Sequence, residues 1–373
     1  MRILVVNPGS TGLKVALVAD GETVSTAQVG AGQALDEVAR VAADWMPLDA
    51  AGVRFVHGGP DHLEPALLDA GLVAELEAVT SLAPLHNPTS LAAAKALLDA
   101  HPDLPLVACF DTSFHAGLPA EAATYAVPRE WNERWRLRRY GFHGLSHEWA
   151  AGRAATLLGR PVEQLRVVTC HLGGGASLCA VVGGRSVDTT MGYTPLEGLV
   201  MQVRSGSVDP GLLLWLQQAA GISAEELNET LEHRSGLKGL SGTSGDMREI
   251  VDGLARDDEA CRLAFDVYVH RLVRELGGMV ASAGGLDVLV FTGGVGEHQH
   301  EVRQAVGERL AWLSVDIDPE RNAAASEDED RDIAGPRSGV PVLVVAAREE
   351  LTAAAHVERA LAVGRNTSAG FGR

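Results

Sequence analysis

The stretch Arg2–Val18, RILVVNPGSTGLKVALV, has two apolar runs on either side of a short turn of small and polar residues. A phosphate-binding P-loop needs the spacing G-x-x-x-x-G-K-[ST] before a helix, and a dinucleotide-binding turn needs G-x-G-x-x-G before a helix. Neither spacing occurs here, and the turn leads into a second strand-like run. Two strands joined by so short a turn must pair antiparallel. We therefore expect a mixed sheet that opens on a β-hairpin.

A second stretch of the chain repeats this layout. VVNPGSTGLKVALVADGETV (residues 5–24) and VTCHLGGGASLCAVVGGRSV (residues 168–187) both read as strand, glycine-rich turn, strand, second turn and return to valine, once a gap of one residue is allowed. The simplest explanation is a duplicated domain in which each half opens on a hairpin. Chance similarity between two glycine hairpins is the alternative.

The remaining pattern indicates an α/β protein. Helical periodicity occurs at Thr89–Leu98, Glu148–Leu158 and Ala260–Ala283. Strand-like runs occur at Ile3–Val6, Val15–Val18, Arg54–Val56, Leu106–Phe110, Val167–Cys170, Leu178–Val182, Val288–Phe291 and Val342–Val345. The length of 373 residues favours two domains over one.

Composition excludes several classes of protein. With 31 basic and 49 acidic residues the formal charge is −18, which repels nucleic acid. The chain shows neither a leader peptide nor an apolar run long enough to cross a membrane, so we expect a cytoplasmic protein without a membrane partner. The four cysteines have no C-x-x-C spacing, which favours buried free thiols.

The glycine turns are candidates for binding phosphates. In the first turn, the hydroxyls of Ser10 and Thr11 accompany backbone N–H groups, with Asn7 and Lys14 at its flanks. HLGGGAS (His171–Ser177) offers a similar backbone cradle, and FTGGVGEH (Phe291–His298) follows a third apolar strand. Three such clusters, each directly after a strand, indicate a polyphosphate ligand.

Polar residues also gather where apolar runs end. They occur in RFVHGG (54–59), PLHNP (84–88), FDTSFH (110–115), YGFHGLSHEW (140–149) and MQVRSGSVDP (201–210). Side chains at strand ends of an open α/β sheet reach the ligand crevice. For any single cluster a structural histidine or ion pair is the ordinary explanation. Together, arginine, aspartate and histidine beside phosphate cradles indicate phosphoryl transfer.

The chain resembles an acetate kinase, from the superfamily that includes sugar kinases, heat-shock ATPases and actin. The likeness runs almost end to end, and YGFHGLSH, FDTSFH, HLGGGAS and TPLEGL occur in the order typical of that family. It implies two duplicated actin-like, ribonuclease H-like domains with the active site in the interdomain cleft. Residues 1–113 and 349–373 would form the N-terminal domain, and residues 114–348 the C-terminal, nucleotide-binding domain.

The resemblance also implies the reaction and its residues. Acetate kinases transfer a phosphoryl group between ATP and a short-chain carboxylate with Mg²⁺. Arg54 and Arg204 would hold the carboxylate and the moving phosphoryl group, Asp111 would orient the metal or the substrate, and His143 and His171 would be active-site histidines. The remaining implied positions are Asn7 and Glu349 at the metal; Val56, Leu85, Phe142 and Pro195 around the acyl group; and Ser10, Lys14, Gly173, Gly174, Gly175, Asp246, Met247, Arg248, Gly294, Val295, Gly296, Glu297 and His298 at the nucleotide.

Several positions depart from the family pattern. Gly12 stands where a third serine is usual, Gly174 where the family has asparagine, and His298 and Arg348 also where it has asparagine. MQVR (201–204) replaces a motif with glycine and threonine before the arginine. Because these changes fall mostly on the nucleotide side, a different phosphoryl donor such as pyrophosphate is an alternative to ATP.

Three further alternatives remain open at this point. A propionate or butyrate kinase would differ only in the acyl pocket. A nucleotide-binding switch without catalysis is compatible with the same fold, because fold alone does not fix function. A metal hydrolase is suggested by His143, His147 and Glu148 with His298 and His300, but the spacing lacks the H-E-x-x-H order of zincins. The family resemblance further implies a homodimer.

Overall fold

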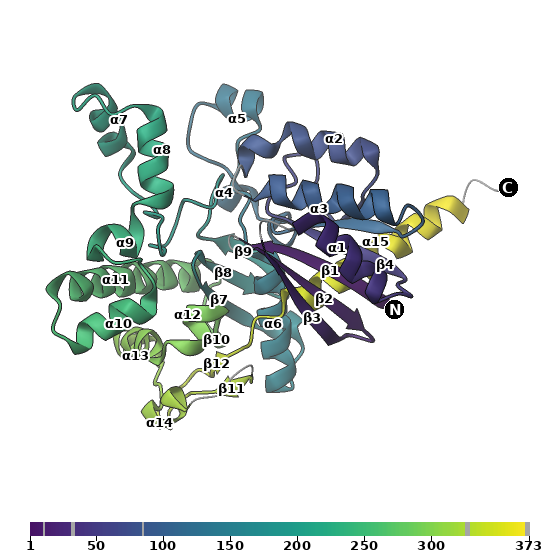
Figure 1. The fold of residues 1–373 in the computed structure, drawn as a ribbon. Coiled ribbons are helices and arrows are strands. Elements are labelled where there is room, and N and C mark those ends of the chain that lie inside the picture. The colour runs from purple at the N-terminus through teal and green to yellow at the C-terminus, as the bar shows by residue number, and fades with distance from the viewer. Residues whose placement is uncertain (10–11, 31–33, 84–85, 325–328, 370–373) are drawn as a thin grey trace. The chain divides into compact units, whose positions relative to one another are not determined.

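The structure is a computed structural model that describes residues 1–9, 12–30, 34–83, 86–324 and 329–369 (Figure 1). The chain divides into two compact units. Unit 1 comprises Met1–Ala116, His143–Trp149 and Arg348–Arg373, and unit 2 comprises Gly117–Phe142 and Ala150–Ala347. His143–Trp149, which the sequence-based boundary assigned to the second domain, pack with unit 1.

Unit 1 is built on a six-stranded mixed sheet in the order β3-β2-β1-β4-β6-β5. The predicted opening hairpin is present, since β1 and β2 pair antiparallel. β4 then pairs parallel with β1, and β6 pairs parallel with β4. The strands are β1 (Arg2–Gly9), β2 (Gly12–Ala19), β3 (Glu22–Gly30), β4 (Ala50–Phe55), β5 (Ala66–Leu67) and β6 (Leu106–Phe110).

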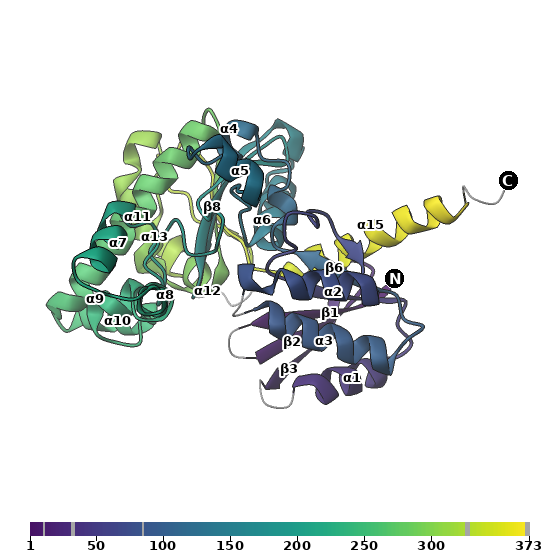
Figure 2. The same cartoon turned by 90° about the horizontal axis from the view of Figure 1, so that it is seen from above.

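Helices cover both faces of this sheet (Figure 2). Successive side chains of a strand point to opposite faces of the sheet, so one strand contributes to a core on each face. Leu4 and Val6 pack in the core beneath α3, while Ile3 and Val5 pack against α15. The helices are α1 (Ala34–Asp44), α2 (Ala70–Ala78), α3 (Asn87–Ala100), α15 (Glu349–Ala369) and the first turns of α6 (Gly144–Leu158), with short 3₁₀ turns at Thr80–Leu82 and Ser113–His115.

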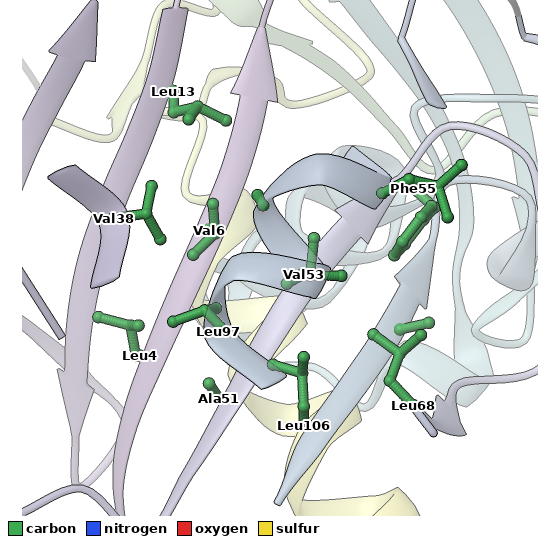
Figure 3. Close-up of a cluster of buried hydrophobic side chains, with 14 of the residues drawn as sticks. Leu4, Val6, Leu13, Val38, Ala51, Val53, Phe55, Leu68, Leu97 and Leu106 are labelled. Atoms are coloured by element: carbon green, nitrogen blue, oxygen red, sulfur yellow. The ribbon is translucent and has the colours of Figure 1, made fainter. Parts of the chain in front are cut away.

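The larger apolar core of unit 1 packs side chains of the sheet against α1, α2 and α3 (Figure 3). Val53 of β4 lies near the middle of this view and Phe55 toward its right side, and both are fully buried. Burial of such side chains stabilises the fold by about 1.5–3 kcal/mol each. This core fixes β4 between β1 and β6, and therefore fixes the residues at the carboxyl ends of these strands.

Unit 2 contains a second six-stranded sheet, in the order β11-β12-β10-β7-β8-β9. Its strands are β7 (Arg166–Leu172), β8 (Ala176–Val182), β9 (Arg185–Thr189), β10 (Val288–Thr292), β11 (Arg331–Asp332) and β12 (Val342–Val344). Its helices are α4 (Ala120–Ala123), α5 (Arg129–Trp135), the rest of α6, α7 (Pro210–Gln218), α8 (Ala224–His233), α9 (Gly236–Ser241), α10 (Met247–Ala255), α11 (Glu259–Ser282), α12 (Gly293–His298), α13 (His300–Arg309) and α14 (Pro319–Ala323), with 3₁₀ turns at Val162–Gln164 and Ala311–Leu313.

The two sheets share one topology and one register. Leu4 pairs with Leu17 on one side and Ala51 on the other, and Val168 pairs with Ala180 and Leu289 in the same way. The interruption of strand pairing also occurs at equivalent positions. The register shifts directly after Leu17 where β2 pairs with β3, and directly after Ala180 where β8 pairs with β9. The weak sequence repeat therefore reflects a structural duplication, as predicted.

Other expectations can be compared with the structure. All eight strand-like runs lie wholly or mostly in strands, whereas β3, β5, β9 and β11 were not predicted. The four cysteines are free and buried, as expected. None of the helices in the described ranges combines the length and the apolar composition that crossing a membrane requires.

Candidate active site

Arg54 and Asp111 form the centre of the candidate site in unit 1. Arg54 lies at the end of β4, and Asp111 follows directly on β6, which runs parallel beside it. The guanidinium donates from Nε to Oδ1 and from Nη2 to Oδ2 of Asp111, each at 2.7 Å. The side chains are only 13% and 2% exposed. This bidentate geometry holds the arginine fork in one orientation.

Asn7 and Glu349 complete the network around Arg54. Nη1 donates to Oδ1 of Asn7 and to Oε2 of Glu349, both at 2.8 Å. The Asn7 amide also donates to the same glutamate oxygen at 2.8 Å. Four of the five N–H donors of the guanidinium are thereby directed at unit 1 itself. Asn7 comes from β1 and Glu349 from the first turn of α15, so four separate segments of the chain meet here.

The charges of this network depend on one another. Burial alone would lower the pKa of Arg54, but the carboxylates of Asp111 and Glu349 outweigh that effect and raise it. Burial raises the pKa of the Asp111 carboxyl, and the Arg54 guanidinium opposes the rise. A buried charge is tolerated only when it is paired, so loss of one partner is costly.

His143 is brought beside Asp111 by tight backbone packing. Its backbone N–H donates to the Asp111 carboxylate, and the N–H of Gly144 donates to the Asp111 carbonyl oxygen at 2.9 Å. A Cβ on Gly144 would lie 2.2 Å from that oxygen, which explains the glycine in YGFHGLSH. His143 itself has φ +55°, in the left-handed region that non-glycine residues rarely adopt. Motifs 30 residues apart in the sequence therefore form one cluster.

A pocket of about 270 Å³ lies over the hairpin of unit 1, with Asn7, Lys14 and Arg54 among its lining residues. Lys14 is 46% exposed, and its ammonium lies 3.7 Å from the Glu350 carboxylate. This is the position predicted for phosphate binding. Two of the predicted residues, Ser10 and Leu85, lie outside the described residues.

A second pocket of about 250 Å³ lies in unit 2 over the corresponding hairpin. It collects predicted nucleotide residues from three distant segments, namely Gly173, Gly174, Asp246, Met247, Arg248, Gly294, Val295 and His298. Asp246 caps α10 and pairs with Arg248 at 2.6 Å, and this partner lowers the pKa of Asp246. The convergence of these segments comes from the fold, because no local pattern joins them.

Other predicted residues of unit 2 lie outside the lining of this pocket. Glu297 is buried and accepts a hydrogen bond from the backbone of Ala347 at 3.1 Å, and Gly296 is buried beside it. The carbonyl of Gly175 accepts from Gly173 at 2.9 Å, which closes the turn. His171 is half-buried at the end of β7, opposite Ser177. These residues belong to the same chain segments as the residues that line the pocket.

Arg204 is held differently from Arg54. Its Nε lies 3.2 Å from the Glu232 carboxylate, and its Nη1 donates to the Pro195 carbonyl at 3.2 Å. Burial lowers its pKa. Val56 is 8% exposed in unit 1, and Phe142 is 1% exposed in unit 2. Because these residues belong to both units, the predicted acyl pocket in an interdomain cleft stays a prediction.

Comparison with known proteins identifies the family of the chain. Residues 23–355 match the model of the acetokinase family. The chain belongs to the acetokinase family. The acetate kinase of Nostoc punctiforme is 47% identical over 309 residues, covering 83% of this chain and 76% of that protein. The acetate kinase of a Synechococcus species is 42% identical and covers 94% of this chain and 96% of the relative.

Solved structures agree with this membership. A crystal structure of Porphyromonas gingivalis acetate kinase has a TM-score of 0.86 at 33% identity, covering 96% of this chain and 99% of that one. A propionate kinase from Francisella tularensis gives the same TM-score and identity, over 95% and 98%. The family resemblance and the α/β fold predicted from the sequence are both confirmed.

This acetokinase-family protein also contains pocket residues that were not predicted as site residues. Gln202, Tyr268 and Gln299 line the unit 2 pocket. Tyr268 is 3% exposed, its hydroxyl has no hydrogen-bond partner among the described residues, and burial raises its pKa. Tyr268 lies within the apolar periodicity of α11, which gave no signal of a binding role. Only Gln202 had a signal, as a departure from the family motif.

Other side chains of the polar clusters have a structural role. Asn87 donates its amide to the His57 carbonyl at 2.8 Å and accepts from the His57 backbone, so RFVHGG and PLHNP are joined. Glu148 contacts His356 at 2.7 Å and Arg359 at 3.1 Å. Within the described ranges no three His, Cys, Asp or Glu side chains form a cluster suited to a metal ion. The metal hydrolase alternative therefore gains no support.

Proposed function

We propose that this protein transfers the γ-phosphoryl group of ATP to acetate, giving acetyl phosphate and ADP, in a reversible reaction. Its acetate kinase relatives support the reaction class. The observation that carries the proposal in this chain is the fixed Arg54 fork, which Asp111, Asn7 and Glu349 hold at one pocket of unit 1. The fifth N–H donor and the guanidinium charge remain for a carboxylate or phosphate oxygen of the substrates.

The chemistry needs no strong base. Acetate is ionised at neutral pH, so one of its oxygens attacks the γ-phosphorus directly. A new bond forms between that oxygen and phosphorus while the bond from phosphorus to the β-phosphate oxygen breaks, and ADP leaves with its electron pair. The protein must position the reactants and neutralise charge on the transferring group.

We assign the residues to this reaction as follows. Arg54 and Arg204 bind the carboxylate and the transferring phosphoryl group, and His143 and His171 donate to its oxygens. Asp111 orients Arg54 through the bidentate pair described above. Val56, Leu85, Phe142 and Pro195 receive the methyl group of acetate. ATP occupies the glycine-lined pocket of unit 2.

Mg²⁺ fits the oxygens of Asn7 and Glu349. Both oxygens accept from the same nitrogen of Arg54, at 2.8 Å each, so they lie close together, and an Mg²⁺ ion held here would use their remaining lone pairs. Oxygen ligands are those that Mg²⁺ prefers. When bound, the ion would neutralise phosphate charge beside the arginine fork.

Two alternatives to an acetate kinase predict different reaction products. A propionate kinase is the alternative favoured by a specific observation, since a propionate kinase has the same fold at 33% identity. One methylene in an apolar pocket changes the free energy of binding by only about 1–3 kcal/mol, so both acids are expected to react. A nucleotide-binding switch would bind ATP without forming an acyl phosphate.

We also propose that the protein acts in the cytoplasm as a homodimer, as the family resemblance implies. Sedimentation equilibrium of the purified protein tests the dimer. A mass of one chain, 39.2 kDa, at micromolar concentration would contradict it.

The central experiment is an acid panel from formate to butyrate with ATP and Mg²⁺, in which hydroxylamine traps the acyl phosphate. We expect the highest kcat/KM with acetate, lower values with propionate and little product with butyrate. Repeating the acetate reaction with GTP and with pyrophosphate tests the donor. Preference for butyrate, or for pyrophosphate over ATP, would overturn the assignment.

A further inference from the structure

Gln202 and Gly174 are neighbours in the lining of the unit 2 pocket. Both residues line it, and the backbone N–H of Gln202 donates to the Gly174 carbonyl at 3.2 Å. A Cβ added to Gly174 would lie 3.2 Å from Oε1 of Gln202. That separation is tighter than ordinary van der Waals contact, so a larger residue at 174 would compete with the glutamine for space.

The two positions depart from the family pattern in opposite directions. Acetate kinases have asparagine where this chain has Gly174, and glycine where it has Gln202. A carboxamide is thus lost from the glycine turn of the hairpin and gained on the segment hydrogen-bonded to it. Glutamine is one methylene longer than asparagine, which extends its reach from the neighbouring backbone.

We propose that the side-chain amide of Gln202 binds the phosphates of the nucleotide in this chain, in place of the side-chain amide that the family pattern has at position 174. This inference rests on the proposed function, because it assigns the unit 2 pocket to ATP. The Gln202 side chain is half-buried and has no hydrogen-bond partner among the residues that the structure describes, so its N–H donors are available.

The position of this side-chain amide affects the choice between ATP and pyrophosphate as the phosphoryl donor. The loss of asparagine at position 174 was the reason to consider pyrophosphate in place of ATP. If Gln202 supplies the amide, the pocket keeps an uncharged hydrogen-bond donor for phosphate oxygens beside the backbone of Gly173 and Gly174. It also keeps Asp246, Met247 and Arg248, which a pyrophosphate donor would not need. Gln202 therefore removes the need to assume a donor other than ATP, while any preference for a nucleotide comes from Asp246, Met247 and Arg248.

The experiment is an exchange of the two residues. Binding of ATP and of adenosine is measured by titration calorimetry for the wild type, Gln202→Gly, Gly174→Asn and the double variant. A hydrogen bond to a charged group accounts for about a ten- to hundredfold change in affinity, so we expect Gln202→Gly to weaken ATP by that factor. Adenosine affinity should not change, because adenosine carries no phosphate.

The other variants test the exchange itself. Gly174→Asn alone should not tighten ATP, since its side chain meets Gln202, whereas the double variant should recover wild-type affinity within about threefold. Gln218→Gly, exposed at the end of α7, is the control for removing a glutamine and should leave both affinities unchanged. Circular dichroism melting curves show whether each variant is folded.

The outcomes separate this inference from the proposed function. ATP affinity of Gln202→Gly within twofold of the wild type would overturn the inference alone. So would an equal loss for adenosine, or a double variant as weak as Gln202→Gly. If the Gln202 effect is found but no acetyl phosphate forms, the inference stands and the acetate kinase assignment fails. A wild type that binds no ATP overturns both.

Discussion

The two sheets of this protein are alike at one end and different at the other. At the amino ends of β1 and β7, the N–H of Arg2 donates to Asp49 at 2.7 Å, and the N–H of Arg166 donates to Asp287 at 2.9 Å. By register these four residues occupy equivalent positions. The aspartate accepts the same backbone hydrogen bond in both sheets. Only Arg166 also donates from its side chain to its aspartate, whereas the Arg2 guanidinium donates to the carbonyls of Pro47 and Trp45.

The carboxyl ends have diverged completely. Counting from the same registers, Asn7, Arg54 and Asp111 of unit 1 correspond to His171, Thr292 and Ala347 of unit 2. Unit 1 therefore ends in a charged network, whereas the equivalent corner of unit 2 has a half-buried histidine, a buried hydroxyl and a methyl group. Strand pairing fixes the scaffold through backbone groups alone, so the side chains at the carboxyl ends of the strands are free to change. This is how one duplicated fold provides two different pockets.

The largest effect is expected where the two corners differ most. Arg54→Ala should lower kcat/KM for acetate at least a hundredfold, because an oriented donor to the transition state is lost and Asp111 and Glu349 are left buried without their partner. Steady-state kinetics by the hydroxylamine assay measures the effect, and circular dichroism shows whether the variant folds.

Thr292→Val is the matched control at the equivalent position of unit 2. The Thr292 hydroxyl is buried and has no hydrogen-bond partner among the described residues, so valine should fit with kcat/KM unchanged within twofold and stability equal or higher. Equal losses from both substitutions would show that the corners do not differ in function.

Gly144→Ala should have the next largest effect. The new Cβ would lie 2.2 Å from the Asp111 carbonyl oxygen, which must move together with the His143 backbone. We expect a loss of stability of about 1–3 kcal/mol and a tenfold or greater fall in kcat. Denaturant titration and kinetics measure the two effects.

Gly152 lies in the same helix, α6, and a Cβ there would meet nothing within 4 Å. Gly152→Ala should therefore stabilise the protein by about 0.5–1 kcal/mol through helix propensity, without changing kcat. If Gly144→Ala behaved in the same way, the close packing of α6 on Asp111 would be wrong.

Acid should destabilise unit 1 through His57. Burial lowers the pKa of His57 from 6.5 to about 4. Between these two values the unfolded chain binds the proton and the folded one does not, so the contribution of His57 to stability is full above pH 6.5 and falls as the pH approaches 4. From pH 7.5 to pH 5 the loss is about 2 kcal/mol.

Urea unfolding at the two pH values, for the wild type and for His57→Gln, measures this contribution. The variant has no imidazole to titrate, so its stability should change less over that interval. An identical pH dependence in both proteins would show that His57 does not carry the effect.

The smallest effect is expected where the two sheets agree. Arg166 lowers the pKa of Asp287 to about 2. Asp287 thus stabilises the fold above pH 3.8, and this stability is lost as the pH falls toward 2. Because the pair is partly exposed, Asp287→Asn should cost about 1 kcal/mol or less at pH 7. Asp49→Asn should cost no more than Asp287→Asn, because only the backbone N–H of Arg2 bonds Asp49. A cost larger by more than about 2 kcal/mol would break the equivalence of the two corners.

The scaffold was more predictable from the sequence than the site. Arg2–Val18 and residues 168–187 show apolar alternation and glycine turns, which local physics converts into hairpins. By contrast, β3 is mostly exposed and polar, so its periodicity is weak. The two-residue strands β5 and β11 have no signal of their own and exist only because a neighbouring strand offers its edge.

The site required the family resemblance. Arg54, Asp111 and Glu349 are far apart in the chain, and only the packing of β4, β6 and α15 brings them within hydrogen-bond distance. Arg54 was predicted as a substrate ligand, and the structure adds that Asp111, Asn7 and Glu349 hold its fork. Gln202 was visible only as an unusual residue in MQVR. Its contact with Gly174 is a tertiary feature that no local pattern encodes.

The most direct test of the central claim is ³¹P NMR of the purified protein with ATP, Mg²⁺ and acetate. The charged corner of unit 1 and the glycine pocket of unit 2 together predict equal amounts of ADP and acetyl phosphate in the wild type and in Thr292→Val. Inorganic phosphate released in place of acetyl phosphate, or full acetyl phosphate formation by folded Arg54→Ala, would contradict the account.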